Sequence, residues 1–124
     1  MRRLLVPLDG SQRGDQILTF LDRMVPELRA RELVLLRVLT ESSAKEAAQE
    51  RLAATARRLT DAGLKPVSLM VVGDDPAAEV VKVADLTRPW LVTLSTHGEG
   101  ESDAPRGSVA ARVIEACPSP LLLV

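Results

Sequence analysis

The regular alternation of short apolar runs with amphipathic segments restricts this chain more than any other feature of its sequence. Five runs rich in leucine and valine recur, at residues 4–8, 33–39, 67–72, 91–94 and 120–124. Continuous apolar runs of this length are typical of strands buried on both faces of a parallel sheet. Strands that alternate with helices over short connections predict right-handed crossovers. We therefore expect an α/β fold of three layers, α/β/α, around a five-stranded parallel sheet.

Between these runs, apolar residues recur at helical spacing. The predicted inward-facing positions are Ile17, Phe20, Leu21, Met24 and Val25 in a first helix, Ala48, Leu52, Ala56, Leu59 and Ala62 in a second, and Ala77, Val80, Val81 and Ala84 in a third. Such spacing places the side chains on one face of each helix. Pro26 and Pro89 are expected to end the first and third helices.

Capping residues mark helix ends. Ser43 followed by Glu46 has the form of a capping box, and Gly63 is well placed to end the second helix as its C-cap. Asp75 is the expected cap of the third helix, because Pro76 then occupies the first helical position, where its missing N–H costs nothing. These signals predict helices that begin directly after Ser43 and Asp75.

The segment 91–124 is predicted to form a strand, a loop, a helix and a final strand. A polar stretch at 95–98 follows the strand, and Gly107 with Ser108 opens a helix that runs to about Cys117 and stops at Pro118. Free backbone N–H groups at a helix start attract anions. The pattern therefore predicts an anion site or, equally well, an ordinary helix start capped by the Ser108 hydroxyl.

Polar residues also follow the first strand, at 9–11. Ligands of open α/β sheets bind beyond the carboxyl ends of the strands, where the strand order reverses. If the first and fourth strands are neighbours, residues 9–11 and 95–98 converge on one crevice. Asp9 then binds a ribose hydroxyl or a metal, or it caps the following turn.

The composition narrows the class of partner. The net charge is −1 and the pI is about 5.8, which gives no general attraction to nucleic acids or anionic membranes. One Phe, one Trp and no Tyr leave no set of rings on which bases could stack. We expect no nucleic-acid partner and no membrane partner.

Length and cysteine usage indicate the compartment. A chain of 124 residues predicts a single domain, residues 1–124. The only cysteine, Cys117, excludes an internal disulfide, fits a reducing cytosol and is expected to be a buried structural thiol. Residues 1–7 imitate the start of a signal peptide, but Asp9 interrupts the apolar stretch too early. No run approaches membrane length, so we expect a soluble, cytoplasmic protein.

Several segments resemble motifs of the universal stress protein family. They are residues 6–11 (VPLDGS), 73–77 (GDDPA), 95–98 (STHG), 107–114 (GSVAARVI) and 117–124 (CPSPLLLV), which together span nearly the whole chain in the right order. The resemblance implies a sheet of order 3-2-1-4-5 and, commonly, a homodimer. One branch of the family binds ATP or AMP through the pattern Gly-x-x-Gly, nine residues, Gly-Ser/Thr. Another branch lacks the pattern and does not bind nucleotide.

The sequence departs from that pattern at two points. Ser95 stands where the first glycine belongs, and eight residues separate Gly98 from Gly107. The resemblance implies phosphate contacts at Gly98, Gly107 and Ser108, and an adenine contact at the backbone of Val38. The full predicted site comprises Pro7, Leu8, Asp9, Val38, Leu94, Ser95, Gly98, Arg106, Gly107, Ser108 and Val109, with no catalytic residue and no metal ligand.

The loop at 99–106 opposes a polyphosphate. Glu99, Glu101 and Asp103 would flank the phosphates, and each like-charge pair at ~6 Å and an effective dielectric near 20 costs about 3 kcal/mol, less where exposed. A magnesium ion bridging carboxylate and phosphate would reverse this sign. The expected cofactor is ATP or AMP, with or without magnesium, bound weakly or not at all.

These observations predict a stress-response protein that acts by binding and signalling. The alternative is a functional ATP-binding protein with slow or no hydrolysis, for which no residue is an obvious general base. His97 with Asp9 and Ser95 or Ser108 lacks the nucleophile elbow that a hydrolytic triad needs. A phospho-receiver domain would need a second carboxylate beside Asp9 and a helix after the fifth strand. The sequence shows neither, so we set this class of protein aside. The apolar run 120–124 predicts an edge strand that pairs in a homodimer.

Overall fold

The computed structural model describes residues 3–8, 19, 23, 32–41, 44–94 and 108–123, with only the backbone of 108–110 and 123. The elements are β1 (Arg3–Leu8), β2 (Glu32–Leu39), α2 (Lys45–Asp61), β3 (Lys65–Val72), α3 (Pro76–Thr87), β4 (Leu91–Leu94), α4 (Ser108–Ala116) and β5 (Leu121–Leu123). All five predicted strands are present. The first predicted helix lies outside the described residues, apart from Thr19 and Arg23, which are helical.

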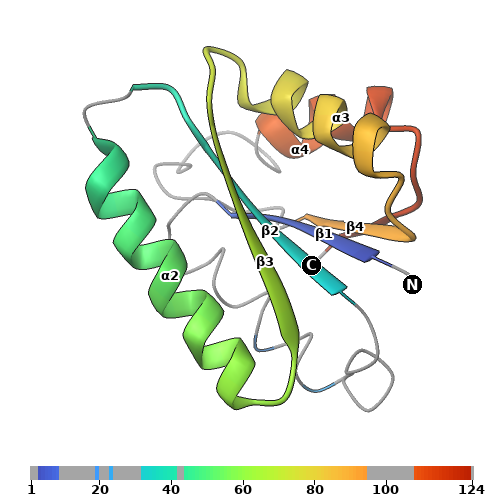
Figure 1. Ribbon diagram of the computed structural model, residues 1–124. Coiled ribbons are helices and arrows are strands. Elements are labelled where there is room, and N and C mark those ends of the chain that lie inside the picture. Colours follow the sequence, from blue (N-terminus) through green and yellow to red (C-terminus); the bar gives the residue numbers. More distant parts are fainter. Residues whose placement is uncertain are drawn as a thin grey trace.

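The strands form one parallel sheet of order β3-β2-β1-β4-β5. Helix α2 covers one face of this sheet, and α3 and α4 lie together on the other (Figure 1). The predicted α/β fold and the predicted strand order are both confirmed. In particular, β1 and β4 are neighbours, which was the condition for a shared crevice.

Side chains of each central strand alternate between two cores. Along β1, Leu4 and Val6 pack on the α2 side, whereas Leu5 packs on the side of α3 and α4. This alternation explains why the strand is apolar at consecutive positions, since both of its faces are covered. On α3 the buried valines are Val80 and Val83, while Val81, expected inside, is only half-buried.

The helix ends follow the predicted signals with one correction. Gly63 adopts φ 91° after α2, and the N–H groups of Gly63 and Leu64 donate to the carbonyls of Thr60 and Leu59 at 3.0 Å, which is a Schellman motif. The N-cap position of α2 belongs to Ala44, without a side-chain hydrogen bond. This position is one residue after the predicted cap, Ser43, which lies outside the described residues.

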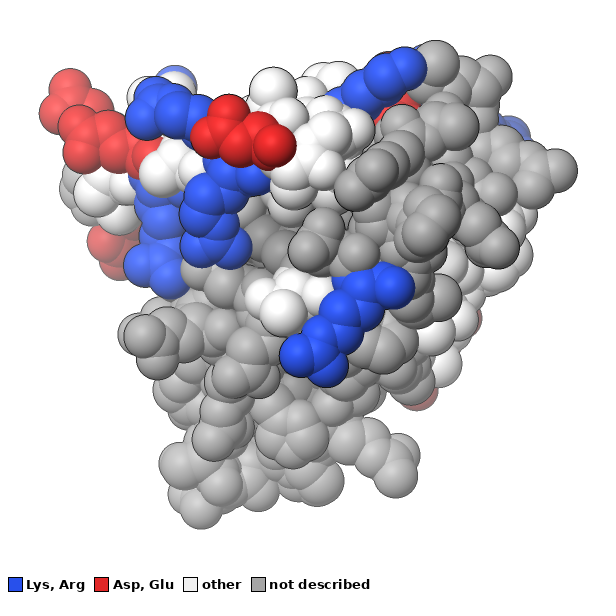
Figure 2. Space-filling view, turned by 90° about the horizontal axis from the view of Figure 1, so that it is seen from below, with Lys and Arg blue, Asp and Glu red and all other residues white. Residues whose placement is uncertain are grey.

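Two further properties concern the surface of the described residues. On the face seen in Figure 2, Lys and Arg side chains lie next to Asp and Glu side chains at one side of the molecule. Within the described part of the chain, no helix has the length and apolar character needed to cross a membrane.

Candidate functional site

The site is defined by the junction of β1 and β4, where the strand order reverses. β1 pairs with β2 over six positions, from Arg3 to Leu8. With β4 it pairs at two described positions, Leu4 with Leu91 and Leu5 with Val92. Within the described residues the last pair is Leu5 with Val92, and ligands of such sheets bind beyond the carboxyl ends of the two strands.

Pro7 removes one hydrogen-bond donor from the β1–β4 ladder. Trp90 N donates to Arg3 O at 2.7 Å, and the buried Thr93 Oγ1 lies 3.5 Å from Leu5 O. The backbone groups of Arg3 and Leu5 thus face β4. Because these groups alternate in direction along a strand, Pro7 also faces β4, and proline has no N–H to donate. The β1–β4 ladder therefore lacks a donor at Pro7.

The backbone of Val38 faces the β1 side of β2, one position past the last residue of β1. Gly73 N donates to Leu39 O at 2.8 Å, so Leu39 faces β3 and the preceding Val38 faces β1. The last residue of β1, Leu8, is in register with Arg37. Val38 therefore lies one position past β1, and Arg37 Nη1 donates to its carbonyl at 3.1 Å.

Helix α4 begins at Ser108, as predicted. Its first turn contains Ser108 and Val109, whose backbone N–H groups belong to the turn that has no intrahelical acceptors. The fully buried side chain of Val113 packs into the core that it shares with Val80 and Leu94. This packing fixes the helix against the sheet face that bears α3.

A bidentate ion pair joins the starts of α3 and α4. Arg112 donates through Nη1 to Asp75 Oδ1 at 2.7 Å and through Nη2 to Oδ2 at 2.5 Å. Asp75 also caps α3, accepting from Ala78 N at 3.3 Å, so its predicted capping role is confirmed. The Arg112 guanidinium, and then the Ala78 N–H, hold the pKa of Asp75 below its ordinary value. The same carboxylate raises the pKa of Arg112.

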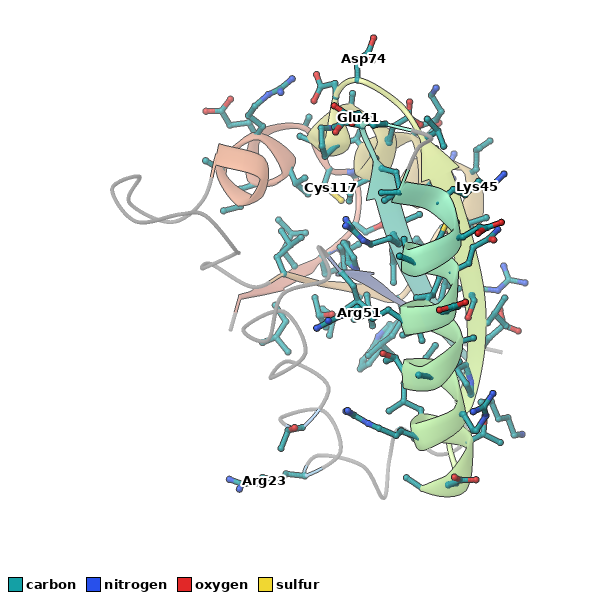
Figure 3. The ribbon with its side chains drawn as sticks, turned by 90° about the vertical axis from the view of Figure 1, so that its left-hand side faces the viewer. Arg23, Glu41, Lys45, Arg51, Asp74 and Cys117 are labelled. Atoms are coloured by element: carbon teal, nitrogen blue, oxygen red, sulfur yellow. The ribbon has the colours of Figure 1, made fainter. Side chains whose placement is uncertain are left out.

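Carboxylates mark the carboxyl edge of the sheet. Glu41 follows β2 and Asp74 follows β3, and both are exposed. Figure 3 shows them at the same end of the molecule as Lys45 in the first turn of α2. Among the described residues there is no group of three or more His, Cys, Asp or Glu side chains that could hold a metal. Cys117 is half-buried against the core under α3 and α4.

The structure brings part of the predicted site together. Pro7, Leu8, Val38, Leu94, Ser108 and Val109 lie at or next to the ends of elements on the carboxyl side of the sheet. The predicted residues Asp9, Ser95, Gly98, Arg106 and Gly107 lie outside the described residues. Sequence reasoning missed the Arg37 hydrogen bond and the partner of Asp75. No local signal in the sequence indicated the pairing of Arg112 with Asp75, because the two residues belong to different helices.

A parallel five-stranded sheet whose order reverses between β1 and β4 defines a doubly wound α/β protein. Its sequence then gives the family. The model of the universal stress protein family matches residues 1–124, and the chain belongs to that family.

Solved structures of similar proteins support the fold. The hypothetical protein MJ0577 is 27% identical, with a TM-score of 0.88 over 99% of this chain and 94% of its own. The universal stress protein from Archaeoglobus fulgidus in complex with dAMP is 18% identical, with a TM-score of 0.80 over 99% and 97%. The Arabidopsis thaliana protein At3g01520 with AMP bound is 12% identical, with a TM-score of 0.76 over 100% and 91%. No curated protein matches the chain.

Proposed function

We propose that this chain binds a nucleoside monophosphate in the crevice between the ends of β1 and β4, and that occupancy rather than turnover is its signal in a stress response. The observation that supports the proposal is that β1 and β4 are neighbours at the point where the strand order reverses. An opening at the reversal of strand order is the usual place for a ligand in such sheets. Two family members of known structure hold AMP and dAMP.

The proposed contacts follow the edge of the sheet. Leu8 and Leu94 end the two strands that border the crevice, and the Val38 backbone faces its β2 side. The N–H groups at the start of α4 suit a phosphate, together with Gly98, Gly107 and Arg106. Asp9 is proposed to contact the ribose. Ser95 replaces the glycine that would allow close approach.

We propose weak binding, and monophosphate in preference to triphosphate. The acidic loop at 99–106 carries three carboxylates, and Glu41 and Asp74 add negative charge along the same edge of the sheet. These charges oppose the β- and γ-phosphates of ATP more than a single phosphate. A magnesium ion would reduce the difference by bridging carboxylate and phosphate.

A second proposed property is assembly into a homodimer. β5 is an edge strand that pairs with β4, and edge strands invite pairing with another chain. On α4, which precedes β5, the side chain of Ile114 is 44% exposed. A two-fold contact through residues 120–124 would cover this edge. If nucleotide does not bind, a cytoplasmic dimeric interaction module of one domain, residues 1–124, is the function that remains.

Calorimetric titration with adenosine, AMP, ATP and magnesium-ATP tests the nucleotide proposal. We expect AMP to bind more tightly than metal-free ATP. Ser108→Ala should weaken AMP binding by ~1.5–3 kcal/mol if the hydroxyl donates to the phosphate. The same change should leave the affinity for adenosine unchanged. Equal AMP affinities of wild type and variant would assign Ser108 to helix capping alone.

A variant with a neutral loop at 99–106 distinguishes repulsion of the phosphates from recruitment of magnesium. Glu99→Gln with Glu101→Gln and Asp103→Asn should strengthen metal-free ATP binding and leave adenosine unchanged, because only the phosphates meet these charges. Weaker magnesium-ATP binding by the same variant would instead show that the loop recruits the metal. If no adenine nucleotide binds the wild type or the triple variant at millimolar concentration, the proposed nucleotide site is closed. The dimeric interaction module is then the function that remains.

A further inference from the structure

Strand β3 exposes aliphatic side chains at the edge of the sheet. It lies at the end of the strand order opposite β5 (Figure 1), and the side chains of Val67, Leu69 and Val72 are 46%, 36% and 48% exposed. In contrast, the side chains of β1, β2 and β4 are buried or half-buried, apart from Arg3. An edge strand with exposed apolar side chains is a template for pairing with another strand.

The backbone of β3 presents hydrogen-bonding groups on the side away from β2. Gly73 N, directly after β3, donates to Leu39 O on β2 at 2.8 Å. Because backbone groups alternate in direction along a strand, the even-numbered residues of β3 face away from β2. The first of them, Pro66, has no N–H to donate. The remaining ones, which carry both an N–H and a carbonyl, are Ser68, Met70 and Val72.

The two ends of β3 carry charges of opposite sign. Lys65 begins the strand and Asp74 follows its end, and both side chains are exposed; Figure 3 shows Asp74 projecting from the molecule. Glu32, which is in register with Lys65, pairs with Arg3 at 2.9 Å. When two copies of β3 pair antiparallel, the positive end of each lies beside the negative end of the other. The net charge of −1 gives little overall repulsion between copies.

One register also matches the apolar side chains. With Leu69 on a two-fold axis, Leu69 lies opposite its own copy, and Val67 lies opposite Val71 of the second copy. These are non-hydrogen-bonded pairs, in which opposite side chains are closest, while Ser68 and Met70 exchange backbone hydrogen bonds across the contact. We propose that β3 is a self-association surface, on which a second copy of this chain pairs antiparallel about Leu69. The contact is independent of the nucleotide site and of the proposed β5 dimer.

The contact should be weaker than that of a stable dimer. One edge strand on another buries less than the roughly 1,200 Å² of a stable interface, so association is expected at about 0.1–1 mM and not at micromolar concentration. Because β3 and β5 are opposite edges of the sheet, a chain that uses both contacts builds tetramers from dimers.

Sedimentation equilibrium from micromolar concentration to about 1 mM tests the association. The mean mass of the wild type should rise toward twice its micromolar value. Leu69→Lys places a charge at the centre of the contact and should hold the mass at the micromolar value throughout. The matched control is Leu86→Lys on α3, where the leucine side chain is 76% exposed, and this variant should associate as the wild type does.

Disulfide formation tests the register. In a background with Cys117→Ala, which removes the native thiol, Leu69→Cys brings two thiols to opposite positions, with Cβ atoms ~4.5–5.5 Å apart. Mild oxidation at high concentration should then give a covalent dimer. Val67→Cys is the matched control, because its two cysteines lie four residues apart along the paired strands, about 13 Å, and should not crosslink.

Three results would contradict the proposal. A wild-type mass that stays at its micromolar value up to about 1 mM would overturn it and leave the edge to a strand of another protein. Association of Leu69→Lys equal to that of the wild type would overturn it as well. Equal crosslinking by Leu69→Cys and Val67→Cys would exclude the antiparallel register about Leu69. The wild-type masses and the crosslinks decide even if Leu69→Lys does not fold.

Discussion

The two halves of the sheet are built differently. On one side of β1, the strands β2 and β3 are paired along eight positions, and β1 pairs with β2 over its full length. On the other side, β1 pairs with β4 at two described positions and β4 with β5 at three. The first half is a continuous scaffold. The second half has fewer described pairs, and it contains the β1–β4 junction at which we propose that the ligand binds.

The difference follows from the sequence of each strand. β2 is apolar at six of its eight positions, and Leu33, Leu35 and Leu36 are fully buried. β4 has four residues, including the polar Thr93, and β5 has three. Pro7 removes the ladder donor between the halves. Each half can therefore be altered separately.

The largest expected effect is on the scaffold half. Leu35→Ala deletes a fully buried side chain in the middle of β2 and should lower the free energy of unfolding by ~2–5 kcal/mol. The same change at Leu121, which is half-buried on β5, should lower it by about 1–2 kcal/mol. Urea unfolding measures both. Equal losses would mean that the two halves contribute alike to stability.

The next effect concerns the edges of the two halves. Leu122→Lys places a charge on β5 and should convert the proposed dimer into monomer, because the strand would carry an unpaired cation into the contact. Leu69→Lys is the matched change on β3, the other edge, where Leu69 is 36% exposed, and it should leave the dimer intact. Sizing with light scattering at micromolar concentration distinguishes them. A monomeric wild type would contradict the dimer.

A smaller effect is expected from the ion pair between α3 and α4. Arg112 lowers the pKa of Asp75 in the folded state, so the pair stabilises the fold above the ordinary pKa of 3.8 and this stabilisation is lost as the pH falls through the lowered value. Asp75→Asn keeps the helix cap but removes the charge. The variant should be less stable than wild type at pH 7.

The pH dependence of this difference is the diagnostic result. Urea unfolding between pH 7 and pH 3 should show a constant gap down to about pH 5 and a shrinking gap below pH 3.8. Asp75→Ala also removes the helix cap, so it should be less stable than Asp75→Asn at every pH in this range. A gap that is the same at pH 3 and pH 7 would show that the charge of Asp75 is irrelevant.

The smallest change in stability is expected where the halves meet. Pro7→Ala supplies an N–H toward β4, and the new hydrogen bond should raise the free energy of unfolding by about 0.5–1.5 kcal/mol. Proline also restricts the unfolded chain, and the loss of this restriction should lower the free energy of unfolding by ~0.4–1 kcal/mol. Stability should stay within about 1 kcal/mol of wild type. Hydrogen exchange at the amide introduced at position 7 should be slow if the ladder extends. Fast exchange there would mean that the ladder does not use this donor.

Local patterns predicted the scaffold better than the site. Apolar runs located all five strands, and the Asp75 and Gly63 signals located two helix ends. Short-range periodicity placed Val81 on the buried face and missed Val83, although Val83 is buried and Val81 is only half-buried. The ion pair of Asp75 with Arg112 joins residues 37 positions apart. Such a contact depends on how α3 and α4 pack, and no local motif encodes it.

The hydrogen bond of Arg37 was missed for a different reason. Its acceptor is the backbone carbonyl of the next residue, and whether that carbonyl faces a neighbouring strand or the crevice depends on the register of β1 with β2. Register is set by the packing of both faces. The family resemblance directed attention to Val38 but gave no account of the side chain beside it.

The most direct test of the central claim is a titration of the ¹⁵N-labelled chain with AMP, followed by amide chemical shifts. A ligand in the crevice should shift the amides of Leu8, Val38, Leu94 and Ser108, and leave those of Val67 and Leu69 on β3 unchanged. Shifts confined to β3, or no shifts with AMP at millimolar concentration, would contradict a nucleotide site where the two halves of the sheet meet.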